Sequence, residues 1–379
     1  MRSGSGVMGG GYGRHSAAQH VGIGTALGML DRAVAALPLP EGGRALRVAD
    51  LGCASGGNAL EPMARVVAAA RDRAPGTAVA VTHTDIPGND FNALVETLSS
   101  PGAYPAGPGV FAYAEARSFF SPLFPPGELH LAWSSIAVHW LSRVPLPIPD
   151  HVYCSGATGS AREALRERSA ADWRAFLHHR AVELVPGGRL VVVGGAATDD
   201  GASGAEGLFG MVVEELRARI DDGQLSDGRF AAMTVPTWNR TSAEFLDPLR
   251  RGPASDWFDL EEKAFAVLPD PVHDRYARDG DLDAYAREVT DSFLAAFGPS
   301  LFTGPGADGG TGGVAGGRAD GEAGHGAGGG AGDATAGRAL VRSFRSGLAA
   351  RIRARPEDAV TNWRVQLLRA ARTDAPAPS

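Results

Sequence analysis

Residues 47–58, RVADLGCASGGN, constrain the fold of this chain more strongly than any other stretch. A short apolar run within it ends in a glycine-bearing turn, and a helical pattern begins at Ala59. A strand, a tight loop and a helix in this order open a doubly wound α/β domain. Gly52 and Gly56 carry no Cβ, so the backbone can turn sharply there and approach a ligand closely. Asp50 ends the strand, at the edge where open α/β sheets bind ligands.

The spacing of the glycines distinguishes among nucleotide-binding folds. The sequence offers Gly52-x-x-x-Gly56-Gly57, which is neither the dinucleotide pattern G-x-G-x-x-G nor a phosphate loop with its lysine. The acidic form D-x-G-x-x-x-G is typical of methyltransferases that use S-adenosylmethionine (SAM), a cofactor without phosphate. Another Rossmann-like function, or a glycine turn without a ligand, are the competing interpretations. Asp50 favours a ligand site over a plain turn.

Composition limits the partners of the chain. Its 379 residues can bury a sizeable core in one large domain or two intimate ones. The net charge of −7 disfavours nucleic acid and anionic membranes as partners. No apolar run approaches the ~20 residues of a membrane helix, and residues 1–16 lack the apolar core of a signal peptide. Cys53 and Cys154 give neither a disulfide framework nor a metal-ligand spacing. We therefore expect a cytoplasmic protein without bound metal, nucleic acid or membrane.

Strand and helix patterns alternate through the first half of the chain. Residues 8–20 are too glycine-rich to begin a helix. Helical spacing of apolar residues predicts helices over residues 25–36, 59–71 and 164–184. Runs of β-branched and apolar residues predict strands over residues 77–84, 110–113, 129–134 and 189–193. This order predicts an α/β fold with a Rossmann-like parallel sheet.

The pattern changes after Asp199. Helices are predicted over residues 207–220, 281–297 and 338–352, and we expect them to form a cap over the carboxyl edge of the sheet. Three prolines break residues 234–253, and residues 258–268 are expected to supply a last antiparallel pair of strands.

The predicted domain boundary follows from this change. Residues 8–200 form a cofactor-binding core with an N-terminal lid segment, and residues 201–370 form the cap with the last strands. Residues 303–337 are a glycine-rich insertion that has almost nothing to bury, so we expect it to be flexible.

Several strings in the chain agree with one family pattern. They are MGGGYGRHS, DLGCASGGN, DIPGNDFN, ARSFFSPLFP, SSIAVHWLSRVP and RAVELVPGGRL. Their order and spacing, from Met8 to about Ala370, resemble the SABATH family of small-molecule methyltransferases. The resemblance implies a class I SAM methyltransferase sheet with a helical cap, and SAM as the cofactor. The family methylates carboxylates such as salicylate, benzoate, jasmonate and indole-acetate, or in some branches a xanthine ring nitrogen. We also expect a homodimer that works in secondary metabolism.

The resemblance carries the SAM site over to residues near three strand ends: Asp50, Gly52, Asn58, Asp85, Ile86, Ser118 and Phe119. Asp85 ends the second strand, where a carboxylate can accept both ribose hydroxyls. Ser118 and Phe119 follow the third strand, where a hydroxyl and an aromatic ring can hold adenine. Asp50 and Asn58 are expected to face the methionine end. Alternatively, Asp85 forms a turn before a proline, and Phe119 is plain core.

The resemblance places the acceptor site at His139 and Trp140. The single N–H of Trp140 can hold one carboxylate oxygen while the other oxygen attacks the methyl group. Without the resemblance, such a pair is more often core than site. Phe209 is expected to line the acceptor pocket, although a core position on a helix explains it nearly as well. A carboxylic acid is already ionised at neutral pH, so we assign His139 and Trp140 as orienting donors, without a general base.

Four positions depart from the family pattern. Gly24 stands where enzymes of benzoate-type acids carry a glutamine, Val21 where a serine is common, and Ile136 where a tyrosine is frequent. Gly195 replaces a larger apolar residue. These changes predict a roomier and less polar pocket. The acidic string that holds a metal in some members is also missing.

The combined prediction is a methyl ester formed from a small carboxylic acid, with an aromatic acid favoured. The alternatives are N- or O-methylation of a small heterocycle or phenol, with His139 as proton acceptor, and a non-catalytic SAM-binding partner of another enzyme.

Overall fold

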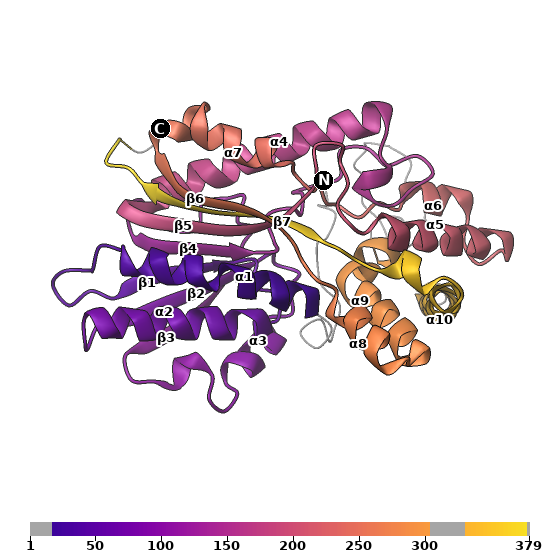
Figure 1. The fold of residues 1–379 in the computed structure, drawn as a ribbon, viewed down its shortest axis with the longest axis horizontal. Coiled ribbons are helices and arrows are strands. Elements are labelled where there is room, and N and C mark those ends of the chain that lie inside the picture. The colour runs from indigo at the N-terminus through magenta and orange to yellow at the C-terminus, as the bar shows by residue number, and fades with distance from the viewer. Residues whose placement is uncertain (1–16, 304–329, 377–379) are drawn as a thin grey trace, which may run out of the picture.

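A seven-stranded sheet forms the centre of the computed structural model, which describes residues 17–303 and 330–376 (Figure 1). The strands are β1 (Leu46–Leu51), β2 (Val79–Asp85), β3 (Val110–Ala116), β4 (Leu129–Ser135), β5 (Leu184–Ala196), β6 (Phe258–Val267) and β7 (Arg364–Arg372). Their order in the sheet is β3-β2-β1-β4-β5-β7-β6. β1 to β5 are parallel, and β7 runs antiparallel to both of its neighbours. The predicted Rossmann-like α/β sheet is confirmed.

Helices cover both faces of this sheet, and a separate group lies at one end of it (Figure 1). The helices are α1 (Ala17–Ala35), α2 (Leu60–Arg73), α3 (Phe91–Leu98), α4 (Gly159–Glu183), α5 (Glu206–Asp221), α6 (Asp227–Ala232), α7 (Ser242–Arg250), α8 (Pro271–Asp279), α9 (Leu282–Phe302) and α10 (Gly330–Ala354). Successive residues of a strand point to opposite faces. Val48 accordingly packs with α1 and α2, whereas Ala49 and Leu51 pack with α4 and α7.

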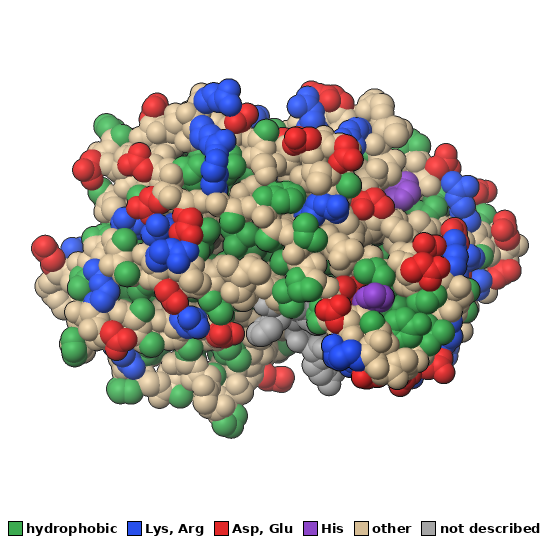
Figure 2. Space-filling view, viewed as in Figure 1, with side chains coloured by type: hydrophobic (Ala, Val, Ile, Leu, Met, Phe, Trp, Pro, Cys, Tyr) green, Lys and Arg blue, Asp and Glu red, His purple; other side chains and the backbone are tan. Residues whose placement is uncertain are grey.

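The helical cap has its own hydrophobic core, built mainly from α5, α9 and α10. Arg351 links α10 to α5 through salt bridges to Glu214 and to the buried Glu215, both at 2.9 Å. Gly347 brings the two helices close, because a Cβ there would meet the Glu215 carboxylate. Acidic and basic side chains likewise lie interspersed over the face in Figure 2. The cap core also contains residues before position 200, such as Leu165, so it extends across the predicted domain boundary.

Two helices differ from their predictions because packing outweighs local propensity. α1 includes residues from Ala17 onward that were expected to be too glycine-rich, since its buried face packs on α2 and the sheet. Pro248, expected to break the chain, lies inside α7. A capping box between Thr241 and Glu244, together with buried Phe245, stabilises α7 against the loss of one backbone donor.

The last strands also differ from the prediction. Residues 258–268 were expected to give a pair of strands, but β6 is a single strand and its partner is β7. β7 was not predicted because RVQLLRAAR is rich in residues that favour helices. Its position between β5 and β6 buries most of its side chains and overrides that preference.

The end of the predicted glycine-rich insertion is helical. α10 begins at Gly330, so residues 330–337 of the predicted flexible insertion are helical. Residues 304–329 and the N-terminal string MGGGYGRHS lie outside the described residues.

Candidate functional site

The glycine turn after β1 has the sharp geometry that the sequence predicts. Gly52 and Gly56 have φ angles of +86° and +82°, in the region that favours glycine. A Cβ on Gly52 would lie 2.4 Å from Ala137 Cβ and 3.3 Å from Phe119 Cε1. The turn therefore packs directly against the segment after β4 and against Phe119, and no larger residue fits there.

Asp85 at the end of β2 holds the turn in shape. Its Oδ2 accepts the Ala54 N–H at 2.7 Å, and its Oδ1 accepts the Ile86 N–H at 2.8 Å. Asn89 adds a bond from its side chain to the Ala54 carbonyl. Burial raises the pKa of Asp85 to about 6. A carboxylate offers about four lone-pair sites, so two remain for hydroxyl donors of a ligand.

Asp50 belongs to a buried chain of polar groups inside the sheet. Its Oδ2 lies 2.8 Å from His83 Nδ1, and His83 Nε2 lies 2.6 Å from the Tyr104 hydroxyl. The strand register places Asp50 beside His83, and both are almost fully buried. His83 was not predicted as a site residue. It fixes one oxygen of Asp50 and leaves the other for a ligand.

The other predicted cofactor residues follow the same strand ends. Ser118 lies after β3, and its Oγ accepts the Phe120 N–H at 3.3 Å. Phe119 is 8% exposed and packs edge-on against Phe176 and Phe120. Asn58 and Ile86 are half-buried directly after β1's turn and after β2.

This set of groups fits SAM. Two carboxylates with spare acceptor sites suit an ammonium group and ribose hydroxyls, and an aromatic ring beside the glycine turn suits adenine. The close approach of Gly52, Ala137 and Phe119 shows that the predicted segments meet at one edge of the sheet.

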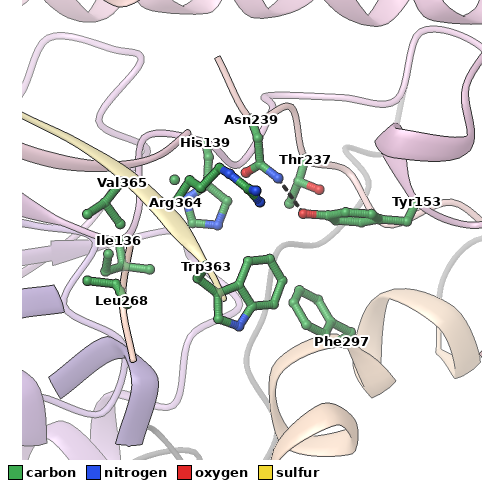
Figure 3. Close-up of a pocket in the computed structure, with 11 residues that line it drawn as sticks. Ile136, His139, Tyr153, Thr237, Asn239, Leu268, Phe297, Trp363, Arg364 and Val365 are labelled. Carbon is green, nitrogen blue, oxygen red and sulfur yellow. Dashed lines mark hydrogen bonds between the residues drawn. The ribbon is translucent and has the colours of Figure 1, made fainter. Parts of the chain in front are cut away.

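A second site, a pocket, lies beyond the ends of β4, β5 and β7 (Figure 3). Three aliphatic side chains line one end of it, and aromatic rings of Phe297 and Trp363 close another side. Polar side chains line the remaining wall. The full lining consists of Ile136, His139, Tyr153, Gly195, Thr237, Asn239, Leu268, Phe297, Trp363, Arg364 and Val365.

His139 presents an unpaired ring nitrogen in this pocket. Its Nδ1 is buried and has no hydrogen-bond partner among the described residues. Burial and the positive charge of Arg240 lower the pKa of His139 to about 3, so the imidazole is neutral at physiological pH. Gly195 provides the space, because a Cβ there would lie 3.0 Å from His139 Cγ and 2.9 Å from Asn239 Oδ1. The room predicted at Gly195 is therefore occupied by two polar side chains, His139 and Asn239.

Trp140 and Phe209 lie behind the lining of this pocket. The Trp140 ring packs against Phe297 at 6.1 Å, and its indole N–H has no hydrogen-bond partner among the described residues. Phe209 is fully buried and stacks on Tyr153 at 3.7 Å, so it supports the tyrosine ring. Of the predicted acceptor residues, His139 alone lines the pocket.

Five lining residues whose side chains carry polar atoms were not predicted as site residues: Tyr153, Thr237, Asn239, Trp363 and Arg364. They come from three segments that no local pattern connects. The Tyr153 hydroxyl accepts a bond from Asn239, which joins two of these segments across the pocket.

A metal site is not evident in the described ranges, where no three His, Cys, Asp or Glu side chains gather. No helix in the described ranges has both the length and the apolar character needed to cross a bilayer.

Comparison with known proteins agrees with the geometry. Gibberellic acid methyltransferase 1 of Arabidopsis thaliana is 27% identical over 306 residues, 73% of this chain and 80% of that protein. Methyltransferase LUC1 of Fusarium sp is 31% identical, over 61% of this chain and 62% of that protein. Salicylate carboxymethyltransferase of Clarkia breweri is 28% identical, over 52% of this chain and 58% of that protein. A structure of loganic acid methyltransferase with SAH superposes with a TM-score of 0.71 at 19% identity, covering 97% of this chain and 98% of that one.

The family profile described as SAM dependent carboxyl methyltransferase matches residues 1–303. This match covers most of the chain, and it agrees with the strings that resemble SABATH enzymes. The chain therefore belongs to the SAM-dependent carboxyl methyltransferases, and its cofactor is SAM.

Proposed function

We propose that this enzyme transfers the methyl group of SAM to a carboxylate oxygen of a small acid, preferably an aromatic one, held in the pocket beside His139. Phe297 and Trp363 offer flat apolar surfaces to a ring. The Gly52 turn touches Ala137, two residues before His139, so cofactor and acceptor sites adjoin.

The chain's residues take separate roles in this proposal. Asp85 and Asp50 hold the cofactor by its hydroxyl and ammonium groups, and Phe119, Ser118 and Asn58 complete its site. Bound SAM supplies an electrophilic methyl group on a sulfonium. His139 donates a hydrogen bond to one oxygen of the acceptor carboxylate, and the indole N–H of Trp140 assists at the inner wall. Phe209 acts indirectly, by holding the Tyr153 ring. Such positioning contributes ~7–11 kcal/mol at best.

The neutral, unpaired His139 is the observation that carries the proposal. A carboxylate needs a donor but no base, because it is already ionised. Methylation of a phenol or a ring N–H needs removal of a proton, and a base with a pKa of about 3 accepts protons poorly at neutral pH. The acceptor chemistry therefore favours an acid over a phenol or a heterocycle.

A panel of acceptors with methyl-labelled SAM tests this proposal. The panel contains aromatic and aliphatic acids. For comparison it also contains, for each aromatic acid, a phenol with the same ring, and one xanthine. We expect label transfer to acids only, in a product that mild alkali hydrolyses as an ester. Turnover of phenols or xanthines to an alkali-stable product would contradict it. SAM binding measured by calorimetry without any turnover would favour a non-catalytic partner.

A homodimer in the cytoplasm, working in secondary metabolism, stays a prediction. Sedimentation velocity of the purified chain tests the dimer, since a single species at the monomer mass would contradict it.

A further inference from the structure

Arg364 is a cation fixed in the wall of the acceptor pocket (Figure 3). It is the first residue of β7, and its backbone N–H donates to the Ser203 carbonyl at 3.1 Å. The neighbouring Asn362 N–H donates to the Gly204 carbonyl at 2.8 Å. A Cβ on Gly204 would lie 2.8 Å from Arg364 Nη1. The absence of a side chain at Gly204 therefore leaves space for the Arg364 guanidinium, and two backbone hydrogen bonds fix the position of the Arg364 backbone.

Arg364 is half-buried, and it differs from the fully buried arginines because its guanidinium forms no hydrogen bond or ion pair within the described residues. Arg180 pairs with Glu183 at 2.8 Å, and Arg240 donates to two backbone carbonyls. Arg372 is likewise bonded to the Ala181 carbonyl. Arg364 makes no ion pair and no side-chain hydrogen bond with any residue in the described ranges, and its Nη1 is buried.

Two acidic side chains of the segment that contacts Arg364 have hydrogen-bond partners of their own. Glu206 accepts bonds from the backbone and hydroxyl of Ser203 and from Gly204. Asp200 lies at the surface and accepts the Thr198 hydroxyl; this bond and, to a smaller extent, the charge of Arg364 lower the pKa of Asp200, but the two side chains form no ion pair. The buried Nη1 group of Arg364 is withdrawn from water without a hydrogen-bond partner, which is costly, so an anion that enters the pocket would gain a charge-assisted bond there. The Thr237 hydroxyl, also buried without a hydrogen-bond partner in the described structure, lines the same pocket.

The strand order separates Arg364 from the reacting end of the acceptor. His139 follows β4, which lies beside β1 and its glycine turn, whereas Arg364 begins β7. β5 lies between β4 and β7, so the backbone of Arg364 starts two strands from β4, roughly 10 Å at the usual strand spacing, while the His139 ring lies over Gly195 of β5. Its side chain reaches Gly204 in the cap.

The chemistry of the reaction also argues against a strong cation on the reacting carboxylate. Transfer of a methyl group from a sulfonium to a carboxylate removes both charges as the new C–O bond forms and the C–S bond breaks. A fixed cation on that carboxylate would stabilise the reactants more than the transition state and would slow the reaction. A cation on a second group, whose charge does not change, tightens binding without that penalty.

We propose that Arg364 binds a second negatively charged group of the acceptor, so that the preferred substrate is a small dicarboxylic acid that is methylated at one end. This inference rests on the proposed function, because it assumes a carboxylate acceptor at His139. Arg364 is then a specificity-determining residue, and its effect falls on the binding of the acceptor.

The experiment compares three acceptors that share one ring: terephthalate, its monomethyl ester and benzoate. The parent enzyme should show a KM for terephthalate roughly tenfold to a hundredfold below that for benzoate or the monomethyl ester. Arg364→Met should remove this difference by raising the KM for terephthalate alone, with kcat unchanged. Arg364→Lys should restore part of it, because the charge is kept.

Arg369→Met is the matched control. It lies on the same strand but pairs with Glu261 and Glu262 outside the pocket, so all three KM values should hold. Tm and SAM affinity of each variant, by calorimetry, report on folding.

Two outcomes would overturn the inference. Equal losses for benzoate and terephthalate in Arg364→Met would place the arginine on the reacting carboxylate. A parent enzyme that methylates benzoate but, with S-adenosylhomocysteine present, binds neither terephthalate, isophthalate nor succinate more tightly than the matched monoacid would show that no second anion is bound. Failure of the proposed function looks different, because the parent enzyme would then methylate no acid at all.

Discussion

The cofactor side and the acceptor side of this enzyme differ in whether their key polar groups have hydrogen-bond partners within the protein. At the cofactor side the two carboxylates already have partners in the protein: Asp85 accepts the Ala54 and Ile86 N–H groups, and Asp50 is hydrogen-bonded to His83. At the acceptor side His139 Nδ1, Thr237 Oγ1 and Arg364 Nη1 are buried without a partner among the described residues. A site shaped by internal bonds can keep its form for one constant ligand. A site with unpaired donors instead gains most from a ligand that supplies the missing acceptors, which makes it selective.

The largest effect is expected at Asp85 on the cofactor side. Asp85→Ala removes the proposed acceptor of the ribose hydroxyls and also frees the Ala54 N–H, so SAM affinity should fall on the order of 100-fold or more. Calorimetric titration with SAM measures it, and Asp85→Asn, which keeps the shape, should lose less. Unchanged SAM affinity in both variants would remove Asp85 from the cofactor site.

Trp140→Phe tests the acceptor side with the next largest effect. The substitution keeps an aromatic ring against Phe297 but deletes the only indole donor. We expect kcat/KM for an acid to drop roughly 10- to 100-fold while SAM affinity holds. Steady-state kinetics at saturating SAM measure this. Parental turnover by the variant would mean that His139 orients the carboxylate alone, with Trp140 as packing.

The pH dependence of SAM binding should report on Asp85. Its pKa is raised to about 6 in the free protein, and hydroxyl donors from the ligand favour the ionised form. SAM affinity should therefore be full above pH 7 and fall as pH drops through 6, by about tenfold between pH 7 and pH 5.

The pH dependence of the free protein's stability should have the opposite sign to that of its SAM affinity. A raised pKa means that protonation of Asp85 stabilises the fold below its ordinary pKa of 3.8, and that this contribution is lost as pH rises through about 6. Asp85→Asn should flatten both profiles between pH 5 and pH 7. A profile of SAM affinity that keeps its slope in Asp85→Asn would assign the titration to another group.

The smallest effect is expected at Gly24, which belongs to neither side in the structure. It is exposed on α1, and a Cβ there would touch no other atom within 4 Å. Gly24→Gln should raise Tm by about 2 °C through helix propensity, with the KM for benzoate unchanged. Differential scanning calorimetry and kinetics measure these. A lower KM for benzoate would bring α1 into the acceptor site.

The two sides also differ in how far the sequence reveals them. Asp50, Asp85 and Ser118 each lie within two residues of the end of their own strand, so local patterns and the edge rule for open α/β sheets place them together. His83 was missed although it lies opposite Asp50 in the register, because a polar residue inside a strand carries no signal of its partner.

The acceptor side depends on contacts between distant segments. Arg364 could not be placed, because its strand has the composition of a helix and only burial between β5 and β6 makes it extended. Phe209 shows the converse, since an aromatic residue predicted in the pocket supports a tyrosine that no pattern identified.

β7 leaves the ribosome after the six other described strands, yet it is inserted within the sheet next to β5. Domains fold as their segments emerge, so β1 to β5 can pair before β7 has been synthesised, which leaves one edge of β5 unpaired. That edge is buried and apolar in the finished enzyme, with Val191 to Val193 fully covered. A chain that stalls before Arg364 therefore exposes the unpaired, apolar edge of β5 during translation. Chaperones can bind such an edge, which also tends to pair with other chains.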